Sequence, residues 1–261
     1  ESSRPSISGE IVNQRAAVVL AAGKGTRMKS ELPKVAFPVL GRAMILHVLD
    51  HLSEVGFDRI VLIVGYGREI VEGLVKDRKE NIQFALQAEQ KGTAHAFLCA
   101  EEALKDFHGS VVVTCGDMPM IRTSTFKRLI EQHAAEKNAS TVLSAVLENP
   151  KGYGRLVRGA DGKLARIVEE KDATDEIRLI RETNSGTYVF ESPEIFSVLR
   201  SIDTNNKQNE YYLPDAIKIL NERKQSVGVC FTQDAEEALG ANSQEDVAVL
   251  ESIMNRRLAG V

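Results

Sequence analysis

A short apolar run near the start of the chain leads directly into a glycine-rich turn, and this junction constrains the fold more than any other feature. Residues 16–22 read AAVVLAA, and residues 23–28 read GKGTRM. An apolar run of this length, bounded by glycines, indicates a buried strand. Glycine adopts positive φ easily, so such a turn can bring backbone N–H groups close to an anion. The junction therefore predicts a strand that ends at a phosphate-binding loop.

Basic residues surround this turn. Lys24 and Arg27 lie within it, and Lys34 follows Pro33 a few residues later. An ordinary turn with solvated basic residues is the alternative, but it explains only the glycines and not the lysine after the proline. The motif is not a dinucleotide-binding fingerprint, because Met28 stands where the third glycine is required. It is not a P-loop either, since no Gly-Lys-Ser/Thr follows at the P-loop spacing.

Strand-like and helix-like segments alternate through the first half of the chain, which favours a mostly parallel sheet flanked by helices. We therefore expect a Rossmann-like α/β fold. The expected strands are residues 59–64, 82–86, 110–115 and 140–147, and the expected helices are residues 43–55, 68–77 and 123–137. His47 and His51 lie one turn apart on the first of these helices. That spacing can hold a metal, but no third ligand is in view, so we expect no metal site there.

The composition changes after residue 148. Residues 155–158 and 164–170 flank a DGK turn and predict a small antiparallel hairpin. A strand over 187–190, helices over 193–199 and 213–222, a strand over 226–231 and a closing helix over about 244–258 follow. We divide the chain into a disordered or cloning-derived segment (1–15), a nucleotide-binding half (16–148), a sugar-binding half (149–242) and a C-terminal helix (243–261).

Polar residues follow two of the expected parallel strands. Gln87 ends one strand and leads into Gly92 and Thr93, and Asp117 follows another in the sequence GDMP. The carboxyl ends of parallel strands border the crevice where open α/β sheets bind ligands. A glutamine amide can read a base edge, and a carboxylate suits Mg²⁺. Thr93 as a helix N-cap and Asp117 as a cap of the turn before a proline remain alternatives.

Three further polar residues lie in the second half. Glu169 and Asn184 are at expected strand ends, where they could bind sugar hydroxyls or simply be solvated. Asn242 precedes the closing helix. Taken alone, Asn242 or Ser243 is an ordinary N-cap.

Several separated motifs resemble one family. LAAGKGTRM followed by LPK resembles the signature of the sugar-nucleotide pyrophosphorylases. QAEQKGTAHA, at residues 87–96, is similar to the uridine-reading loop of the uridyltransferases that act on N-acetylglucosamine 1-phosphate. GYGR, IVEEKDA and NSG also recur in those enzymes. The resemblance covers nearly the whole chain from residue 16 to the closing helix.

The resemblance implies a role for individual residues. Arg27 and Lys34 are implied as catalytic residues that neutralise the triphosphate, and Asp117 and Asn242 as ligands of Mg²⁺. Residues implied to bind the substrates are Leu20, Ala21, Ala22, Gly23, Gln87, Gly92, Thr93, Cys115, Gly116, Gly154, Glu169 and Asn184. Gly154, Glu169 and Asn184 are the expected acetamido-sugar contacts. Two positions depart from the family pattern: Cys115, where an aromatic residue is common, and Pro214, where threonine is common.

The reaction that the resemblance implies joins UTP and N-acetylglucosamine 1-phosphate into UDP-N-acetylglucosamine and pyrophosphate. A transferase for another sugar or base, and a sensor that binds without turnover, are the alternatives. A net charge of −4 argues against a nucleic-acid partner. Three widely spaced cysteines suit a reducing cytoplasm, and no apolar run reaches the length of a membrane span. The hexapeptide-repeat β-helix of bifunctional family members is not seen in this sequence, so we expect no acetyl transfer; the oligomeric state stays open.

Overall fold

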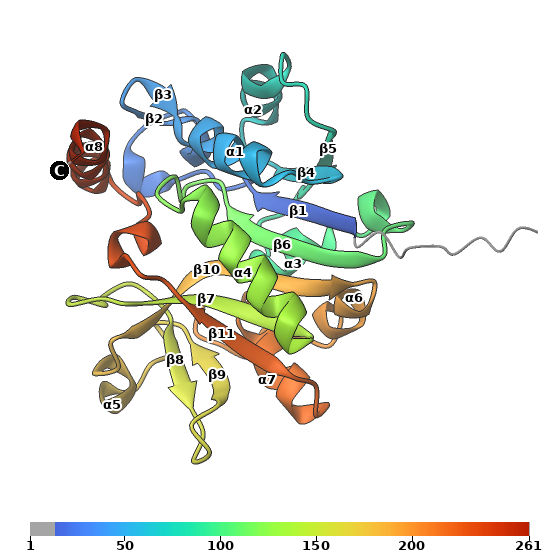
Figure 1. The fold of residues 1–261 in the computed structure, drawn as a ribbon. Helices are drawn as coiled ribbons and strands as arrows, with labels where there is room; N and C mark the ends of the chain where they lie inside the picture. The colour runs from blue at the N-terminus through green and yellow to red at the C-terminus, as the bar shows by residue number, and fades with distance from the viewer. Residues whose placement is uncertain (1–13, 261) are drawn as a thin grey trace, which may run out of the picture.

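A computed structural model describes residues 14–260, and one nine-stranded sheet runs through both halves of this region (Figure 1). The main strands lie in the order β11-β7-β10-β6-β1-β4-β5. Their bounds are β1 Gln14–Leu20, β4 Arg59–Val64, β5 Ile82–Leu86, β6 Gly109–Cys115, β7 Ser140–Val146, β10 Glu182–Ser192 and β11 Val227–Phe231. Neighbouring strands are parallel except where β10 pairs with β6 and β7. The predicted α/β class with a mostly parallel sheet is confirmed.

Helices cover both faces of this sheet. The helices are α1 Met44–Val55, α2 Arg68–Val75, α3 Thr93–Leu98, α4 Thr123–Glu136, α5 Asp175–Arg178, α6 Glu194–Leu199, α7 Asp215–Glu222 and α8 Gln244–Ala259. Successive side chains of a strand point to opposite faces. Val18 packs with residues of α3, α6 and α7, whereas Val19 packs with residues of α1, α2 and α4. The apolar run at residues 16–22 is therefore buried on both faces, as its composition predicts.

β10 is longer than the sequence suggests and joins the two halves. The sequence predicts a strand that is interrupted at residues 184–186 and runs into residues 187–190, whereas β10 spans Glu182–Ser192 and lies between β6 and β7. Its pairing with β7 shifts register between Asn184 and Tyr188, where Gly186 has φ 77°. A residue with positive φ inside a strand breaks the alternating pattern, which is why the sequence hides its continuity. The two halves that the sequence divides at residue 148 therefore share one continuous sheet.

Smaller elements complete the structure. The predicted hairpin is formed by β8 (Arg155–Arg158) and β9 (Leu164–Val168), which pair antiparallel. β2 (Pro38–Val39) pairs with β3 (Arg42–Ala43), and η1 (Thr26–Met28), η2 (Lys34–Ala36), η3 (Glu102–Leu104) and η4 (Ala235–Ala238) are single turns. The C-terminal helix α8 packs its apolar residues on Met28, Val39 and Met44. Residues 1–13 of the expected N-terminal segment lie outside the described residues, and β1 begins at Gln14.

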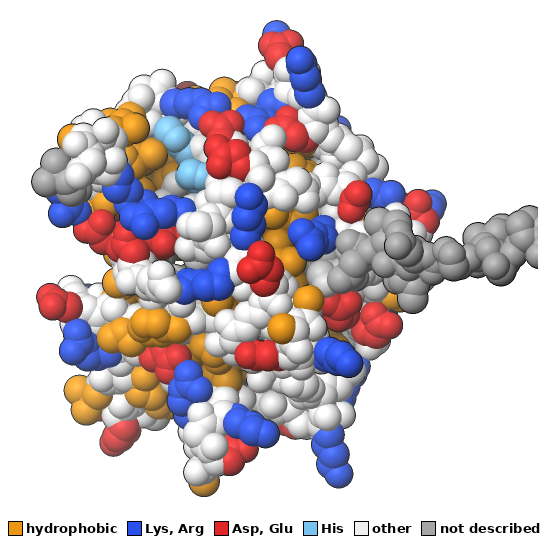
Figure 2. Space-filling model, in the orientation of Figure 1, with side chains coloured by type: hydrophobic (Ala, Val, Ile, Leu, Met, Phe, Trp, Pro, Cys, Tyr) orange, Lys and Arg blue, Asp and Glu red, His pale blue; other side chains and the backbone are white. Residues whose placement is uncertain are grey.

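Charges of both signs are interspersed on the face shown in Figure 2, so no single-sign patch dominates it. None of the helices between residues 14 and 260 is long and apolar enough to cross a membrane.

Candidate nucleotidyl-transfer site

The glycine turn folds back onto Lys34. Gly25 has φ 67°, and a Cβ at this position would lie 2.7 Å from Cβ of Lys34. The backbone N–H of Lys34 donates to O of Gly23 at 3.3 Å, and that of Met28 donates to O of Gly25 at 2.9 Å. Any side chain at position 25 would be strained and would push Lys34 away. The glycine is therefore required because it allows two basic residues, Arg27 and Lys34, to share one small region.

Four side chains from distant parts of the chain meet in what we call the charged cluster: Arg27, Lys34, Asp117 and Asn242. Nζ of Lys34 forms an ion pair with Asp117 and donates to Oδ1 of Asn242 at 2.7 Å. Nη2 of Arg27 donates to the same oxygen at 2.9 Å. The Lys34 and Asp117 side chains are only 17% and 18% exposed. The structure thus brings together all four residues that the sequence proposes for catalysis and metal binding.

Local structure presents Asn242 to this cluster. Ser243, and not Asn242, is the N-cap of α8, and it forms a capping box with Asp246. Asp246 Oδ2 also accepts the backbone N–H of Asn242 at 2.7 Å. Because the capping role falls to its neighbour, the Asn242 side chain is left to bind Arg27 and Lys34.

The charged cluster contains oxygen ligands suited to a divalent cation. Oδ2 of Asp117 and Oδ1 of Asn242 both contact the ammonium of Lys34, so the two oxygens already share one cation. Carboxylate and amide oxygens are hard donors, the kind that Mg²⁺ takes together with substrate phosphates. No group of three or more His, Cys, Asp or Glu residues within 14–260 could form an all-protein metal cage. The donor set therefore fits a metal that is bound jointly by protein and substrate.

A first cavity, of about 210 Å³, lies beside the glycine turn. We call it the glycine-loop cavity. It is lined by Leu20, Ala22, Gly23, Gln87, Gln90, Gly92, Thr93, Ala96 and Glu210. Six of these residues are among those that the sequence proposes for substrate binding. Nε2 of Gln90 donates to O of Ala22 at 2.7 Å, which ties the two loops that face each other across the cavity.

A second cavity, of about 90 Å³, adjoins the first. We call it the Glu169 cavity. Its lining is Leu20, Thr93, Cys115, Glu169, Asn184, Gly186, Tyr188, Leu213 and Pro214. Leu20 and Thr93 line both cavities, so the two cavities are neighbours near the carboxyl end of β1. Both departures from the family pattern, Cys115 and Pro214, border this cavity.

Gly154 supports the Glu169 cavity without lining it. O of Gly154 accepts the backbone N–H of Asn184 at 2.9 Å, and a Cβ at position 154 would lie 3.0 Å from Oε1 of Glu169. The Asn184 side chain donates to the hydroxyl of Tyr188 at 2.6 Å and accepts the N–H of Gly186 at 3.0 Å. The three residues proposed as sugar contacts are therefore neighbours, held by hydrogen bonds within β10 and to the β8 edge.

Two proposed residues lie under the cavities and do not line them. Ala21 is buried and donates its N–H to O of Ile63 at 2.9 Å. Gly116 donates to O of Leu20 at 2.9 Å, and a Cβ there would lie 2.9 Å from Val35. Their role in the structure is to join strand ends closely.

Sequence reasoning missed several lining residues. Gln90 and Ala96 stand within the QAEQKGTAHA motif, so that motif is the signal that could have found them. Glu210 and Leu213 belong to a later segment of the chain, far in sequence from both the glycine turn and this motif, and no local pattern links them to either. Nothing in the sequence around Tyr188 indicates more than a place in a strand, although its side chain lines the Glu169 cavity.

Burial sets the charge state of Glu169. Burial, together with the charges of Asp215 and Asp172, raises the pKa of the Glu169 carboxyl from 4.5 to about 7. Burial likewise raises the pKa of Asp215 to about 6. These carboxyls border another cavity, of about 350 Å³, which also contains Tyr212. Glu169 lines both this cavity and the Glu169 cavity.

The raised pKa of Glu169 gives this group a contribution to the free energy of unfolding that decreases as pH rises. Between pH 4.5 and 7 the folded state keeps a proton that the unfolded state releases, so the free energy of unfolding decreases across this window. Glu169→Gln removes the effect. We expect the variant to gain about 1 to 3 kcal/mol relative to the wild-type protein between pH 5 and pH 8, measured by urea unfolding. Glu148→Gln, at an exposed position, is the control, and an equal gain there would contradict the assignment.

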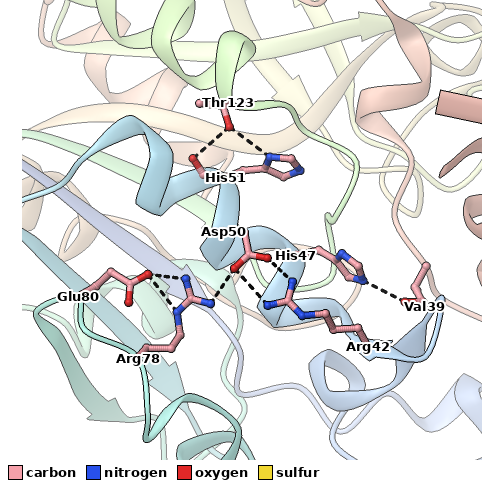
Figure 3. Close-up of polar contacts among 8 residues, drawn as sticks. All are labelled: Val39, Arg42, His47, Asp50, His51, Arg78, Glu80 and Thr123. Atoms are coloured by element: carbon pink, nitrogen blue, oxygen red, sulfur yellow. Dashed lines mark hydrogen bonds and ion pairs between the residues drawn. The ribbon is translucent and has the colours of Figure 1, made fainter. Parts of the chain in front are cut away.

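The two histidines of α1 serve structural contacts (Figure 3). Nε2 of His47 bonds O of Val39 at 3.0 Å, whereas Nδ1 of His51 lies 3.2 Å from Oγ1 of Thr123. They point to different partners and converge on no common centre. Between them Asp50 pairs with Arg42 and Arg78 in a surface ion network.

Comparison with known proteins identifies the family of the chain. A family model described as nucleotidyl transferase matches residues 16–249. "Bifunctional protein GlmU" of Oceanobacillus iheyensis is 47% identical over 244 residues, which are 94% of this chain and 53% of that protein. The protein of the same name from Streptococcus uberis is 44% identical over 242 residues, which are 93% of this chain and 52% of that protein. The chain spans about half the length of these relatives.

A solved structure shows the same fold. The crystal structure of a UDP-glucose pyrophosphorylase complexed with UDP-glucose superposes with a TM-score of 0.74 and covers 94% of this chain and 99% of that one, at 18% identity. The fold and the family resemblance predicted from the sequence are both confirmed. With most of its length matched by the family model, the chain belongs to the nucleotidyl transferase family.

Proposed function

We propose that the chain transfers the uridylyl group of UTP to N-acetylglucosamine 1-phosphate and releases pyrophosphate. The observation that carries the proposal is the arrangement of the site: the glycine-loop cavity and the Glu169 cavity share Leu20 and Thr93, and Gly23 of the first cavity belongs to the turn that also carries Arg27 of the charged cluster. A nucleotide sugar consists of a base, a phosphate bridge and a sugar. In this site the three parts would occupy the glycine-loop cavity, the charged cluster and the Glu169 cavity. The names of the GlmU relatives and of the UDP-glucose pyrophosphorylase support this class of product.

The chemistry needs no protein nucleophile. A phosphate oxygen of the sugar phosphate attacks the α-phosphorus of UTP in line, the bond to the β-phosphate oxygen breaks, and pyrophosphate leaves with the electron pair. Positioning and charge neutralisation supply most of the catalysis in such transfers. Arg27 and Lys34 provide two positive charges at the glycine turn, where the phosphates would lie. The attacking phosphate is already ionised near pH 7, so no strong general base is required.

Mg²⁺ is the metal we propose for this site, held by Asp117 and Asn242. When bound there, the ion would neutralise phosphate charge during the transfer. Asp117 and Asn242 contact Lys34 in this structure. If the same two oxygens hold the cation, the Lys34 ammonium becomes available to a phosphate oxygen.

We assign the base to the glycine-loop cavity and the acetamido sugar to the Glu169 cavity. Gln87 and the 91–93 loop would contact the base edge, while Glu169, Asn184 and the backbone of Gly154 would contact the sugar. The small volume of the second cavity suits one substituent of a sugar ring more than the whole ring.

Changing Glu169 should separate sugar recognition from nucleotide binding. With a pKa of about 7, the Glu169 carboxyl is mostly ionised only above neutral pH. A hydrogen bond to the ionised form contributes roughly 1.5 to 3 kcal/mol, so at about pH 8 Glu169→Ala should lower kcat/KM for the sugar phosphate by roughly 10- to 100-fold. The Kd for UTP should stay close to that of the wild-type protein. Steady-state kinetics and equilibrium binding measure the two quantities, with Glu169→Gln as the isosteric control. The division of the site fails if UTP affinity falls as far as sugar use.

A substrate matrix tests the proposed function. UTP, CTP, ATP and dTTP would each be combined with N-acetylglucosamine 1-phosphate, glucosamine 1-phosphate and glucose 1-phosphate, with nucleotide sugar quantified by chromatography. We expect the highest kcat/KM for UTP with the N-acetylated sugar. A clear preference for another base or another sugar would identify the chain as a transferase for that pair of substrates. Binding without product in every pair would indicate a sensor.

A further inference from the structure

The buried amide of Gln87 is fixed in one orientation by its neighbours. Its Nε2 donates to the backbone O of Gly92 at 3.1 Å and lies 3.1 Å from Nδ1 of His95. Only 4% of Gln87 is exposed. A backbone carbonyl can only accept a hydrogen bond, so the atom that faces Gly92 must be the amide nitrogen. The second hydrogen of that nitrogen is then available to His95.

This arrangement also specifies the tautomer of His95. Nδ1 must accept the hydrogen bond from Gln87, so the imidazole is neutral and carries its proton on Nε2. Burial is the largest cause that lowers the pKa of His95, with the charge of Lys91 next, and Glu89 opposes them. Arg200 and Tyr211 border the same cavity as His95, and the Tyr211 ring lies 6.5 Å away. These surroundings favour the neutral form that the hydrogen bond requires.

The remaining polar atom of the amide is Oε1 of Gln87. With Nε2 bonded to Gly92 and His95, no donor from residues 14–260 is bonded to this oxygen. Gln87 lines the glycine-loop cavity, which we assign to the base. The amide therefore offers an acceptor, and not a donor, to a ligand in that cavity.

Uracil and cytosine differ at the edge that such an acceptor would meet. Uracil has an N3–H donor between two carbonyl groups, whereas N3 of cytosine is an acceptor beside an amino group. An amide free to turn over could satisfy either base by exchanging its oxygen and nitrogen. An amide held with its oxygen opposite N3 accepts from uracil N3–H, whereas with cytosine the same oxygen would face the lone pair of N3.

We propose that His95 is a positioning residue that, together with the Gly92 carbonyl, holds the Gln87 amide with its oxygen toward the base and thereby selects uracil over cytosine. The inference rests on the proposed function, because it assumes that the glycine-loop cavity receives the base. His95 acts through Gln87 and does not itself contact the nucleotide. Its loss should change the choice between bases more than it changes the transfer chemistry.

The ratio of kcat/KM for UTP to that for CTP tests this role. His95→Leu removes the acceptor and should lower the ratio roughly tenfold or more, the scale of one buried hydrogen bond. His95→Asn places Oδ1 near the position of Nδ1 and should restore most of the ratio. 5-Methyl-UTP, which has the same N3–H, is the control substrate, and its rate relative to UTP should not change. An unchanged UTP to CTP ratio in His95→Leu would overturn the inference.

A double-mutant cycle separates positioning from a general packing effect. Gln87→Ala should lower the same ratio, and adding His95→Leu to it should lower the ratio no further, because one residue acts through the other. Additive losses would show that His95 does not act through Gln87. The same ratios taken from Kd values of UTP and CTP test the inference even if the chain fails to turn over, so failure of the proposed function stays distinguishable.

The tautomer of His95 can be measured directly in the wild-type protein. Nitrogen-15 NMR of the imidazoles distinguishes the two tautomers, and with five histidines in the chain the His95 signal can be identified by its loss in His95→Asn. We expect an unprotonated Nδ1 and a protonated Nε2 at pH 7.5. A proton on Nδ1 would contradict the hydrogen bond on which the proposal depends.

Discussion

Lys34→Ala should lower kcat/KM by on the order of 10²-fold or more, the scale of losing one preorganised charge contact at a reacting phosphate. Lys34 is the member of the charged cluster that contacts both Asp117 and Asn242, and its side chain is only 17% exposed. Its removal deletes a positive charge and also leaves two oxygens without their shared cation. Steady-state kinetics with UTP and the sugar phosphate measure the effect.

Lys24→Ala is the matched control for this experiment. Lys24 lies on the same glycine turn, but its Nζ stands over the ring of Tyr66, 5.1 Å from the centroid, and the residue is exposed. A general attraction of phosphates by loop charge would make the two variants similar. A specific contact in the charged cluster requires a much larger loss for Lys34→Ala, and equal losses would contradict the assignment.

Asp117→Ala should have a comparably large effect, but one that changes with metal concentration. Without this carboxylate only Asn242 remains as a protein ligand, so turnover should fall by on the order of 10²- to 10³-fold and the metal concentration for half-maximal rate should rise. Rates measured across a Mg²⁺ titration give both quantities. Removal of Asp117 also leaves the mostly buried ammonium of Lys34 without its ion-pair partner, so thermal unfolding is measured beside the kinetics to show that the variant is folded.

Asp117→Asn keeps the shape of the side chain and removes its charge. It should resemble Asp117→Ala in activity if charge matters, and the wild-type protein if only the hydrogen bond to Lys34 matters. Wild-type turnover in excess chelator would count against the use of a metal at all.

The sequence predicts those parts of the site that depend on local pattern. The run at residues 16–22 and the glycines after it determine where β1 ends and how the turn folds, and both signals lie within a dozen residues. Asp117 follows a strand rich in valine and threonine, and Gln87 follows the short run IQFAL, so their place at the carboxyl edge of the sheet follows from topology. Parallel strands end at the same edge, and the polar residues after them meet there.

The remaining features depend on contacts between distant segments. Nothing near Lys34 indicates that one ammonium would bind both Asp117 and Asn242. The length of β10 is hidden by the break at Gly186, and Glu210 reaches the glycine-loop cavity from a loop whose sequence is merely polar. These contacts depend on how the whole sheet is assembled. Only the resemblance to the family indicated some of them, such as the role of Asn242, from the sequence.

The coupling between the two substrates tests the central claim most directly. Pyrophosphate release from UTP would be measured with and without N-acetylglucosamine 1-phosphate, together with the amount of nucleotide sugar formed. Direct transfer within one continuous site requires release only when the sugar phosphate is present, with one nucleotide sugar formed for each pyrophosphate. Release from UTP alone, or release without an equal amount of UDP-N-acetylglucosamine, would contradict the account.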